Sequence, residues 1–246
     1  MRSSFRFDMK ILLCANNIVG LEVARYLKKE NIIALGIHAP KKQVFTEEIK
    51  RTIRGIPVLV GQDINDEKLI KQLIPDIIIC AFWAYILKSE ILKIPKFGCI
   101  NFHPSLVPYN RGMNPNVWPF IDGTPAGVTI HYMVEKPDAG DVIIQEKVDI
   151  EPVDTAGSLD DKLHRKLVEL FKEVWPLIKE NKAPRTKQIG KGTRHLLKDV
   201  NKLDRLNKSD MKVVNKLRAR NFRDRTYSYF IENGRKVKVY IKLKYV

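Results

Sequence analysis

The sequence lacks long apolar segments, and it contains few cysteines. Although 44% of its 246 residues are apolar, no run approaches the roughly 20 residues of a membrane-spanning helix, so we expect no membrane partner. The first ten residues, MRSSFRFDMK, lack the apolar core of about 7–15 residues that defines a signal peptide. The three cysteines, Cys14, Cys80 and Cys99, lie in apolar contexts without metal-ligand spacing. We interpret them as buried, reduced thiols of a cytoplasmic protein that has no metal site.

The chain has fewer acidic residues than basic ones. The chain has 44 Lys and Arg residues against 28 Asp and Glu, a net charge of +16. From residue 191 onwards there are 17 basic residues and 5 acidic ones, which gives +12 in the last quarter. Such an excess indicates either a polyanionic partner or a solvated surface. The partner could be a phosphorylated small molecule, tRNA or an acidic surface, and charge alone does not decide between them.

The first 81 residues alternate between predicted strands and helices. The strands span residues 9–15, 31–38, 58–60 and 76–81, and the helices span residues 18–29 and 67–73. The turn after the first strand, ANNIVG, lacks the G-x-G-x-x-G pattern of a dinucleotide site. Because the last strand is a continuous apolar run, we expect it to be buried on both faces of a parallel sheet. We therefore predict an α/β, Rossmann-like core with a mostly parallel sheet.

An apolar, aromatic segment follows the last of these strands. It consists of Phe82, Trp83, Ala84, Tyr85, Ile86 and Leu87. The segment could be a loop packed on the core, or it could form one wall of a slot for a flat heteroaromatic ligand. The residues themselves leave both interpretations open.

Residues 98–141 hold the side chains best suited to chemistry. A short strand is predicted at residues 98–100, and Asn101 and His103 follow it on a proline-containing loop. A second strand, residues 128–133, leads towards Asp138. We expect the amide, imidazole and carboxylate to lie just beyond the ends of two core strands, where open α/β sheets bind ligands.

These three groups are sufficient to transfer a carbonyl carbon to an amine. The Asn101 amide could hold a developing oxyanion, and His103 could act as an acid or base near neutral pH. Asp138 could orient the histidine or accept a proton from the amine, or it could only cap a turn. Ser105 has no base spaced suggestively nearby, so we do not predict a Ser-His-Asp triad. His131 lies within the second strand, a position that favours a structural role.

The remainder of the chain predicts a long helix and a small basic module. Apolar residues at spacings of three and four mark a helix over residues 155–178, and residues 181–193 resemble a domain boundary. We thus predict a catalytic domain at residues 1–190 and a C-terminal region at residues 191–246.

That C-terminal region holds a predicted basic helix at residues 208–220. A β-hairpin follows, with an Asn-Gly turn between residues 227–231 and 236–245. The apolar face of the second arm, formed by Val237, Val239, Ile241 and Leu243, needs a covering surface, so we expect a homodimer through the hairpin.

The motifs NFHPSLVP, RG, GVTI and DAGD at residues 101–141 resemble those of formyltransferases that use 10-formyltetrahydrofolate. The resemblance covers roughly residues 9–190 and implies that family's core fold. It further implies that Asn101, His103 and Asp138 form the catalytic set. The implied folate site combines the segment at residues 82–87 with His131 and Asp138, and no metal is implied.

The continuation YNRGMNPNVW is most similar to the nucleotide-sugar N-formyltransferases. This similarity implies that the substrate is bound by Ser105, Tyr109, Asn110, Arg111, Asn114, Asn116 and Trp118. The implied reaction formylates a dTDP-linked 4-amino-4,6-dideoxy sugar, the glucose-configured one, for surface polysaccharide (O-antigen) synthesis, with no nucleic-acid partner. The alternatives are a methionyl-tRNA formyltransferase-like enzyme and a non-catalytic folate- or tRNA-binding module.

Overall fold

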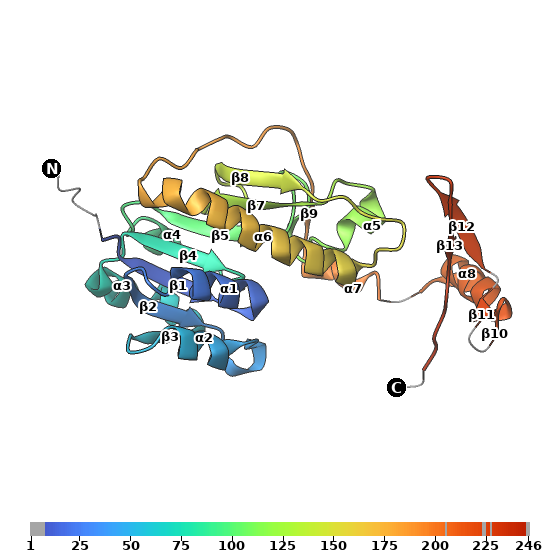
Figure 1. Cartoon of the computed structure of the whole chain (residues 1–246), viewed down its shortest axis with the longest axis horizontal. Coiled ribbons are helices and arrows are strands. Elements are labelled where there is room, and N and C mark those ends of the chain that lie inside the picture. Colours follow the sequence, from blue (N-terminus) through green and yellow to red (C-terminus); the bar gives the residue numbers. More distant parts are fainter. Residues whose placement is uncertain (1–7, 205, 223–224, 227, 245–246) are drawn as a thin grey trace.

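A computed structural model describes residues 8–204, 206–222, 225–226 and 228–244 (Figure 1). The main sheet contains β1 (Ile11–Ala15), β2 (Ile32–Ile37), β3 (Val58–Val60), β4 (Ile77–Ala81), β5 (Cys99–His103), β7 (Gly127–Tyr132) and β8 (Val142–Lys147). The helices of the main body are α1 (Asn17–Leu27), α2 (Thr46–Thr52), α3 (Glu67–Leu73), α4 (Ser89–Leu92), α5 (Trp118–Asp122), α6 (Ala156–Lys179) and α7 (Leu197–Asn201), with 3-10 turns η1 (Pro40–Lys42) and η2 (Gly61–Asn65). Outside the main sheet lie β6 (Arg111–Gly112), β9 (Arg194–His195), α8 (Lys208–Ala219), β10 (Asn221–Phe222), β11 (Arg225–Thr226), β12 (Tyr229–Glu232) and β13 (Arg235–Lys238).

The sheet has seven strands in the order β3-β2-β1-β4-β5-β7-β8. All pairs from β3 to β5 are parallel, whereas β7 runs antiparallel to both β5 and β8. The fold is therefore α/β with a mostly parallel sheet, as predicted. None of the helices in the described residues is long and apolar enough to cross a membrane.

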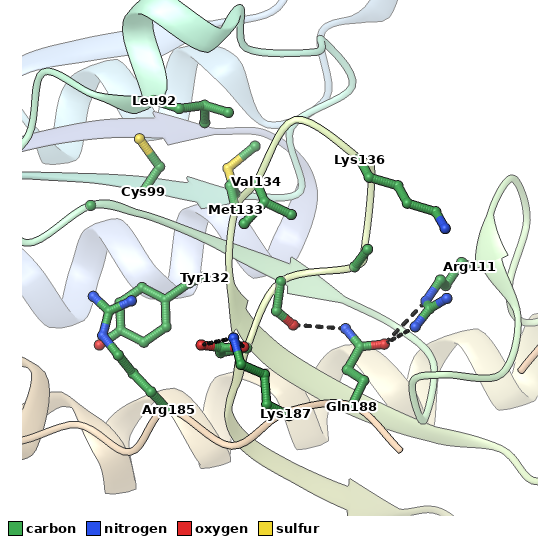
Figure 2. Close-up of a pocket in the computed structure, with 14 residues that line it drawn as sticks. Leu92, Cys99, Arg111, Tyr132, Met133, Val134, Lys136, Arg185, Lys187 and Gln188 are labelled. Carbon is green, nitrogen blue, oxygen red and sulfur yellow. Dashed lines mark hydrogen bonds and ion pairs between the residues drawn. The ribbon is translucent and has the colours of Figure 1, made fainter. Parts of the chain in front are cut away.

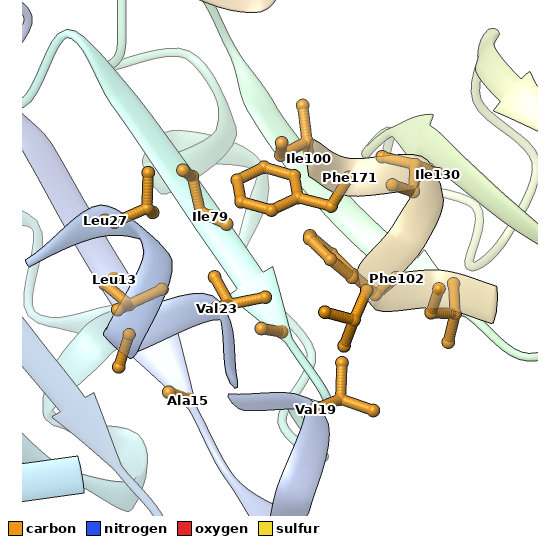
Figure 3. Packing of buried hydrophobic residues seen from close by; sticks show 14 of the residues in the cluster. Leu13, Ala15, Val19, Val23, Leu27, Ile79, Ile100, Phe102, Ile130 and Phe171 are labelled. Atoms are coloured by element: carbon orange, nitrogen blue, oxygen red, sulfur yellow. The ribbon is translucent and has the colours of Figure 1, made fainter. Parts of the chain in front are cut away.

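Helix α6 packs against one face of the sheet. It begins after Thr155, whose hydroxyl accepts a hydrogen bond from the Ser158 backbone N–H, as an N-cap does. Its apolar stripe packs beside α1 onto the sheet, where the fully buried Phe171 ring lies 5.0 Å from that of Phe102 (Figure 3). Residues of α3, α4 and η2 form a second apolar cluster with other sheet residues, and Cys14, Cys80 and Cys99 are buried free thiols in it.

Strand β5 is longer than predicted. Its antiparallel partner β7 pairs Asn101 with His131 and His103 with Thr129, so the strand continues to His103. The expectation that Asn101 and His103 lie on a loop was therefore wrong. The prediction also placed Asp138 at the sheet edge where β5 ends, and this was wrong. Strand β7 runs antiparallel to β5, so it ends at the opposite edge of the sheet. Residues 133–141 instead fold back, so that Asp138 lies near His103.

The part of the C-terminal region from α8 onwards lies apart from the sheet in Figure 1, beyond α7. Asn233 and Gly234 have φ values of 49° and 73°, which suit the predicted type I′ hairpin turn. The second strand ends at Lys238, and residues 239–244 form no strand, which corrects the prediction of an arm reaching residue 245. Val237, Val239 and Ile241 are half-buried. The predicted arm residues Tyr227 and Tyr245 lie outside the described residues.

We propose that the chain divides into the predicted catalytic domain and C-terminal region. The short strand β9 pairs with β6, so residues up to His195 are in contact with the main body.

Candidate active site

The candidate site lies on the face of the sheet opposite α6. Side chains alternate along a strand, so Cys99, Asn101 and His103 share one face of β5, while Ile100 and Phe102 enter the cluster packed against α6. On β7 the matching residue is His131, which pairs with Asn101. Amide and imidazole groups are thus brought together by strand register.

The ring of His103 lies between the Asn110 carbonyl and the Asp138 carboxylate. The Nε2 atom of His103 lies 3.2 Å from the carbonyl oxygen of Asn110, and a carbonyl only accepts, so Nε2 must carry a hydrogen. The Nδ1 atom lies 3.6 Å from the carboxylate oxygen Oδ1 of Asp138. Both side chains are largely buried. At this separation a proton can pass between the imidazole and the carboxylate, directly or through one water.

His131 is the neutral member of the cluster. Burial lowers its pKa from 6.5 to about 4. Its Nδ1 atom lies 2.9 Å from the Tyr132 carbonyl oxygen and so carries the hydrogen. The lone pair of Nε2 then faces the Asn101 amide nitrogen at 3.4 Å. This contact orients the Asn101 amide and leaves its second N–H for another acceptor.

The loop that carries Asp138 is shaped by close contacts with the backbone. Asp138 has a φ of 56°, and its Oδ2 atom accepts a hydrogen bond from the Gly112 N–H at 2.9 Å. A Cβ atom on Gly140 would lie 1.8 Å from the Tyr132 carbonyl oxygen, so only glycine allows the loop to fold back so tightly. The loop turns the carboxylate towards His103.

A cleft of about 500 Å³ lies beside this loop (Figure 2). Part of its wall is apolar and includes Leu92, Cys99 and Met133. Burial raises the pKa of the Cys99 thiol, which therefore acts as a small apolar group. The other lining residues include the basic side chains of Arg111, Lys136, Arg185 and Lys187. The cleft can thus hold an apolar or flat ring together with anionic groups. Among the described residues, no group of three or more His, Cys, Asp and Glu could hold a metal ion.

The aromatic segment at residues 82–87 does not line this cleft. Leu87 and Trp83 pack in the same apolar cluster as Cys99. Tyr85 packs 5.3 Å from the His38 ring, and Phe82 packs 4.6 Å from His164. Ala84 and Ile86 are exposed.

The predicted substrate residues divide into three groups. Arg111 lines the cleft. Tyr109 and Asn114 are exposed. The remaining four have internal partners: Ser105 donates to the Tyr109 carbonyl, Asn110 is bracketed by Thr124 and Thr193, Asn116 donates to the Ala156 carbonyl, and Trp118 donates to the Met113 carbonyl.

Sequence reasoning did not include Gln188, which lines the cleft. It lies in the segment taken as a domain boundary, because that segment shows no helical or strand periodicity. A segment that contacts the site through isolated side chains and short strand pairs leaves no periodic signal in the sequence.

Residues 59–175 match the formyl transferase family model. The chain is 41% identical over 139 residues to the methionyl-tRNA formyltransferase of Bacillus licheniformis, a match that covers 55% of this chain and 44% of that protein. The chain thus spans less than half the length of that relative.

Two solved structures are similar over more of their length. A 4-N formyltransferase from Francisella tularensis has 28% identity and a TM-score of 0.69, covering 97% of this chain and 99% of that one. The formyltransferase PseJ from Anoxybacillus kamchatkensis, solved with UDP-4,6-dideoxy-4-formamido-L-AltNAc and tetrahydrofolate, has 29% identity and a TM-score of 0.57, covering 81% of this chain and 92% of that one. These findings confirm the resemblance to the formyltransferases, and the fold is most like that of the sugar enzymes.

Proposed function

We propose that this protein transfers a formyl group from 10-formyltetrahydrofolate to the amine of a dTDP-linked 4-amino-4,6-dideoxy sugar. We take the sugar to be the glucose-configured one and the pathway to be surface polysaccharide (O-antigen) synthesis. The observation that carries the proposal is the approach of His103 Nδ1 to Asp138 Oδ1, at 3.6 Å, beside the Asn101 amide. Acyl transfer to an amine requires such a proton acceptor and such an amide donor.

We assign the folate co-substrate to the cleft, which is lined by Ala139 and Gly140, the residues that follow Asp138. Its volume of about 500 Å³ falls within the usual range of small-molecule sites. Leu92, Cys99 and Met133 would hold the ring system, and the basic side chains of the cleft suit carboxylates. When bound, the co-substrate supplies the formyl carbon.

Each catalytic residue has a role that its contacts allow. The free N–H of Asn101 donates to the oxygen on which negative charge develops. The ring of His103, held at Nε2 by the Asn110 carbonyl, adds electrostatic support to the same oxyanion. The Asp138 carboxylate orients this ring or accepts the proton that the amine loses. No residue needs to form a covalent bond with the substrate.

A second candidate is formylation of methionyl-tRNA, which the identity to the Bacillus licheniformis protein favours. We prefer the sugar as substrate because this chain matches 99% of the length of the Francisella tularensis 4-N formyltransferase. It matches only 44% of the length of the Bacillus licheniformis tRNA enzyme. The sequence outside the shared region would need to supply tRNA binding, and the described part of the C-terminal region holds two helices, α7 and α8, and short strands.

One reaction mixture can separate the two candidates. Purified protein and 10-formyltetrahydrofolate would be incubated with initiator methionyl-tRNA and with the glucose- and galactose-configured dTDP-4-amino-4,6-dideoxy sugars, and the products identified by mass spectrometry. We expect one added formyl group on the glucose-configured sugar and none with the His103→Asn variant. Formylated methionyl-tRNA beside unchanged sugars would instead assign the tRNA reaction.

We further propose a homodimer formed through the C-terminal hairpin. Tyr229, Phe230 and Ile231 on β12 are all exposed, Ile231 by 59%. Consecutive exposed apolar residues are characteristic of an interface. A two-fold axis through the hairpin would cover this surface with an identical one.

A further inference from the structure

We infer that Gln188 is a positioning residue, through which residues 186–195 hold Asp138 in place. We call residues 186–195 the strap. The inference rests on the proposed function only in treating Asp138 as catalytic. The strap lies beyond residue 175, where the match to the formyl transferase model ends.

The side-chain amide of Gln188 bridges two parts of the site (Figure 2). Its Nε2 atom donates to the carbonyl oxygens of Asp138 at 2.9 Å and of Gly140 at 2.8 Å. Its Oε1 atom accepts from Nε of Arg111 at 3.1 Å and also from Nη2. Both amide hydrogens are therefore donated, and the oxygen accepts twice. The amide can face only one way, because a flipped amide would place donors against donors and acceptors against acceptors.

These contacts fix Asp138 from its backbone side. Its backbone φ of 56° is one that residues other than glycine adopt infrequently, so this conformation needs support from neighbouring groups. Gln188 binds its carbonyl oxygen, and the Gly112 N–H binds its carboxylate at Oδ2. With both ends held, the remaining oxygen Oδ1 is directed towards His103.

The second support also depends on the strap. Gly112 lies in β6, which pairs with β9 of the strap. The N–H groups on either side of Gly112 donate to strap carbonyls: Arg111 to Thr193 at 3.1 Å and Met113 to His195 at 3.0 Å. At its other end the strap is joined to β8 by the bridge between Thr186 and Val142. Both groups that hold Asp138 are thus themselves held by one segment.

Two substitutions at Gln188 and one control test this role. Gln188→Met keeps the length of the side chain and removes its hydrogen bonds. Gln188→Glu keeps an acceptor for Arg111 but directs a carboxylate at two carbonyl oxygens, so it loses the donors selectively. Ile189→Gln is the matched control, because Ile189 is the next residue and is 85% exposed.

We expect kcat for formyl transfer to fall about 10–100-fold in both Gln188 variants, since small misplacements of catalytic groups have effects of this size. Ile189→Gln should behave as the unmodified protein. The ¹⁵N NMR shifts of the His103 ring should move in both Gln188 variants, because the partner of Nδ1 is displaced. Should Gln188→Met fail to fold, Gln188→Glu, which retains the Arg111 contact, carries the test.

The inference is overturned if either folded variant keeps the kcat and the His103 ring shifts of the unmodified protein. It is also overturned if only thermal stability falls, because a purely structural residue would give that result. The NMR measurement needs no turnover. If the unmodified protein formylates no amine, the proposed function fails, while the ring shifts still decide whether Gln188 positions Asp138.

Discussion

The buried His131 should make the folded protein sensitive to acid, and replacing it should remove part of that sensitivity. Its ring is 1% exposed, and burial lowers its pKa to about 4 from 6.5. Above pH 6.5 the ring is neutral in both the folded and the unfolded chain, so it has no effect on the pH dependence of stability. As the pH falls from 6.5 towards 4, the unfolded chain binds a proton that the folded protein does not bind. Stability therefore decreases over this window.

The size of the loss follows from the two pKa values. Each pKa unit corresponds to about 1.4 kcal/mol, so the shift from 6.5 to about 4 corresponds to a loss of about 3 kcal/mol in unfolding free energy. Burial also lowers the pKa values of His38 and His164, so they act in the same direction. A comparison between two proteins that differ only at residue 131 removes their contribution.

The comparison is between the unmodified protein and His131→Gln, measured by urea unfolding at several pH values from 7 to 4. Glutamine does not titrate, and it keeps an amide N–H that can donate to the Tyr132 carbonyl. The substitution should lower the unfolding free energy at pH 7. As the pH falls, the unfolding free energy of the variant should decrease less than that of the unmodified protein, so that the difference between them shrinks by about 3 kcal/mol at low pH. Parallel curves would show that His131 is not held neutral by burial, and the account of the cluster would be wrong.

Three further predictions concern other parts of the chain. Replacing Phe230 and Ile231, which are exposed on β12, with Asp should give monomers in sedimentation velocity, and the hairpin dimer is refuted if the unmodified protein is already monomeric at micromolar concentration. Phe171→Ala, which empties a fully buried site, should lower the unfolding free energy by about 3–5 kcal/mol in chemical denaturation; a cost under about 1 kcal/mol would show that the ring is not part of the core. The basic C-terminal region should bind tRNA only weakly in a filter assay, and sub-micromolar affinity with a steep salt dependence would favour the tRNA reaction.

The predictable part of the fold was the part whose sequence is periodic or continuously apolar. The helix after Thr155 and the parallel strands up to β4 were predicted because burial dictates their patterns. The direction of β7 was not predictable from its residues. A strand buried on both faces has the same composition whether it runs parallel or antiparallel to its neighbour.

The same limit explains how the candidate site was predicted. Asn101, His103 and Asp138 were chosen by residue type, and the structure places them near one another. The predicted course of the chain to Asp138 was wrong, since this residue comes from the opposite edge of the sheet on a loop that folds back. Gly140 allows the loop to fold back, because a side chain at this position would collide with the Tyr132 carbonyl. No local sequence pattern indicates this contact. Gln188 was missed because its role depends on carbonyl groups 48 and 50 residues away.

The measurement that tests the central claim most directly is the single-turnover rate of formyl transfer in His103→Asn, Asp138→Asn and the double variant. Each single substitution should lower the rate about 10²–10⁴-fold while circular dichroism shows an intact fold. Because the two side chains face each other and act as one unit, the double variant should be no slower than the more damaging single variant. A folded single variant with a near-normal rate, or strictly multiplicative losses in the double variant, would contradict the account.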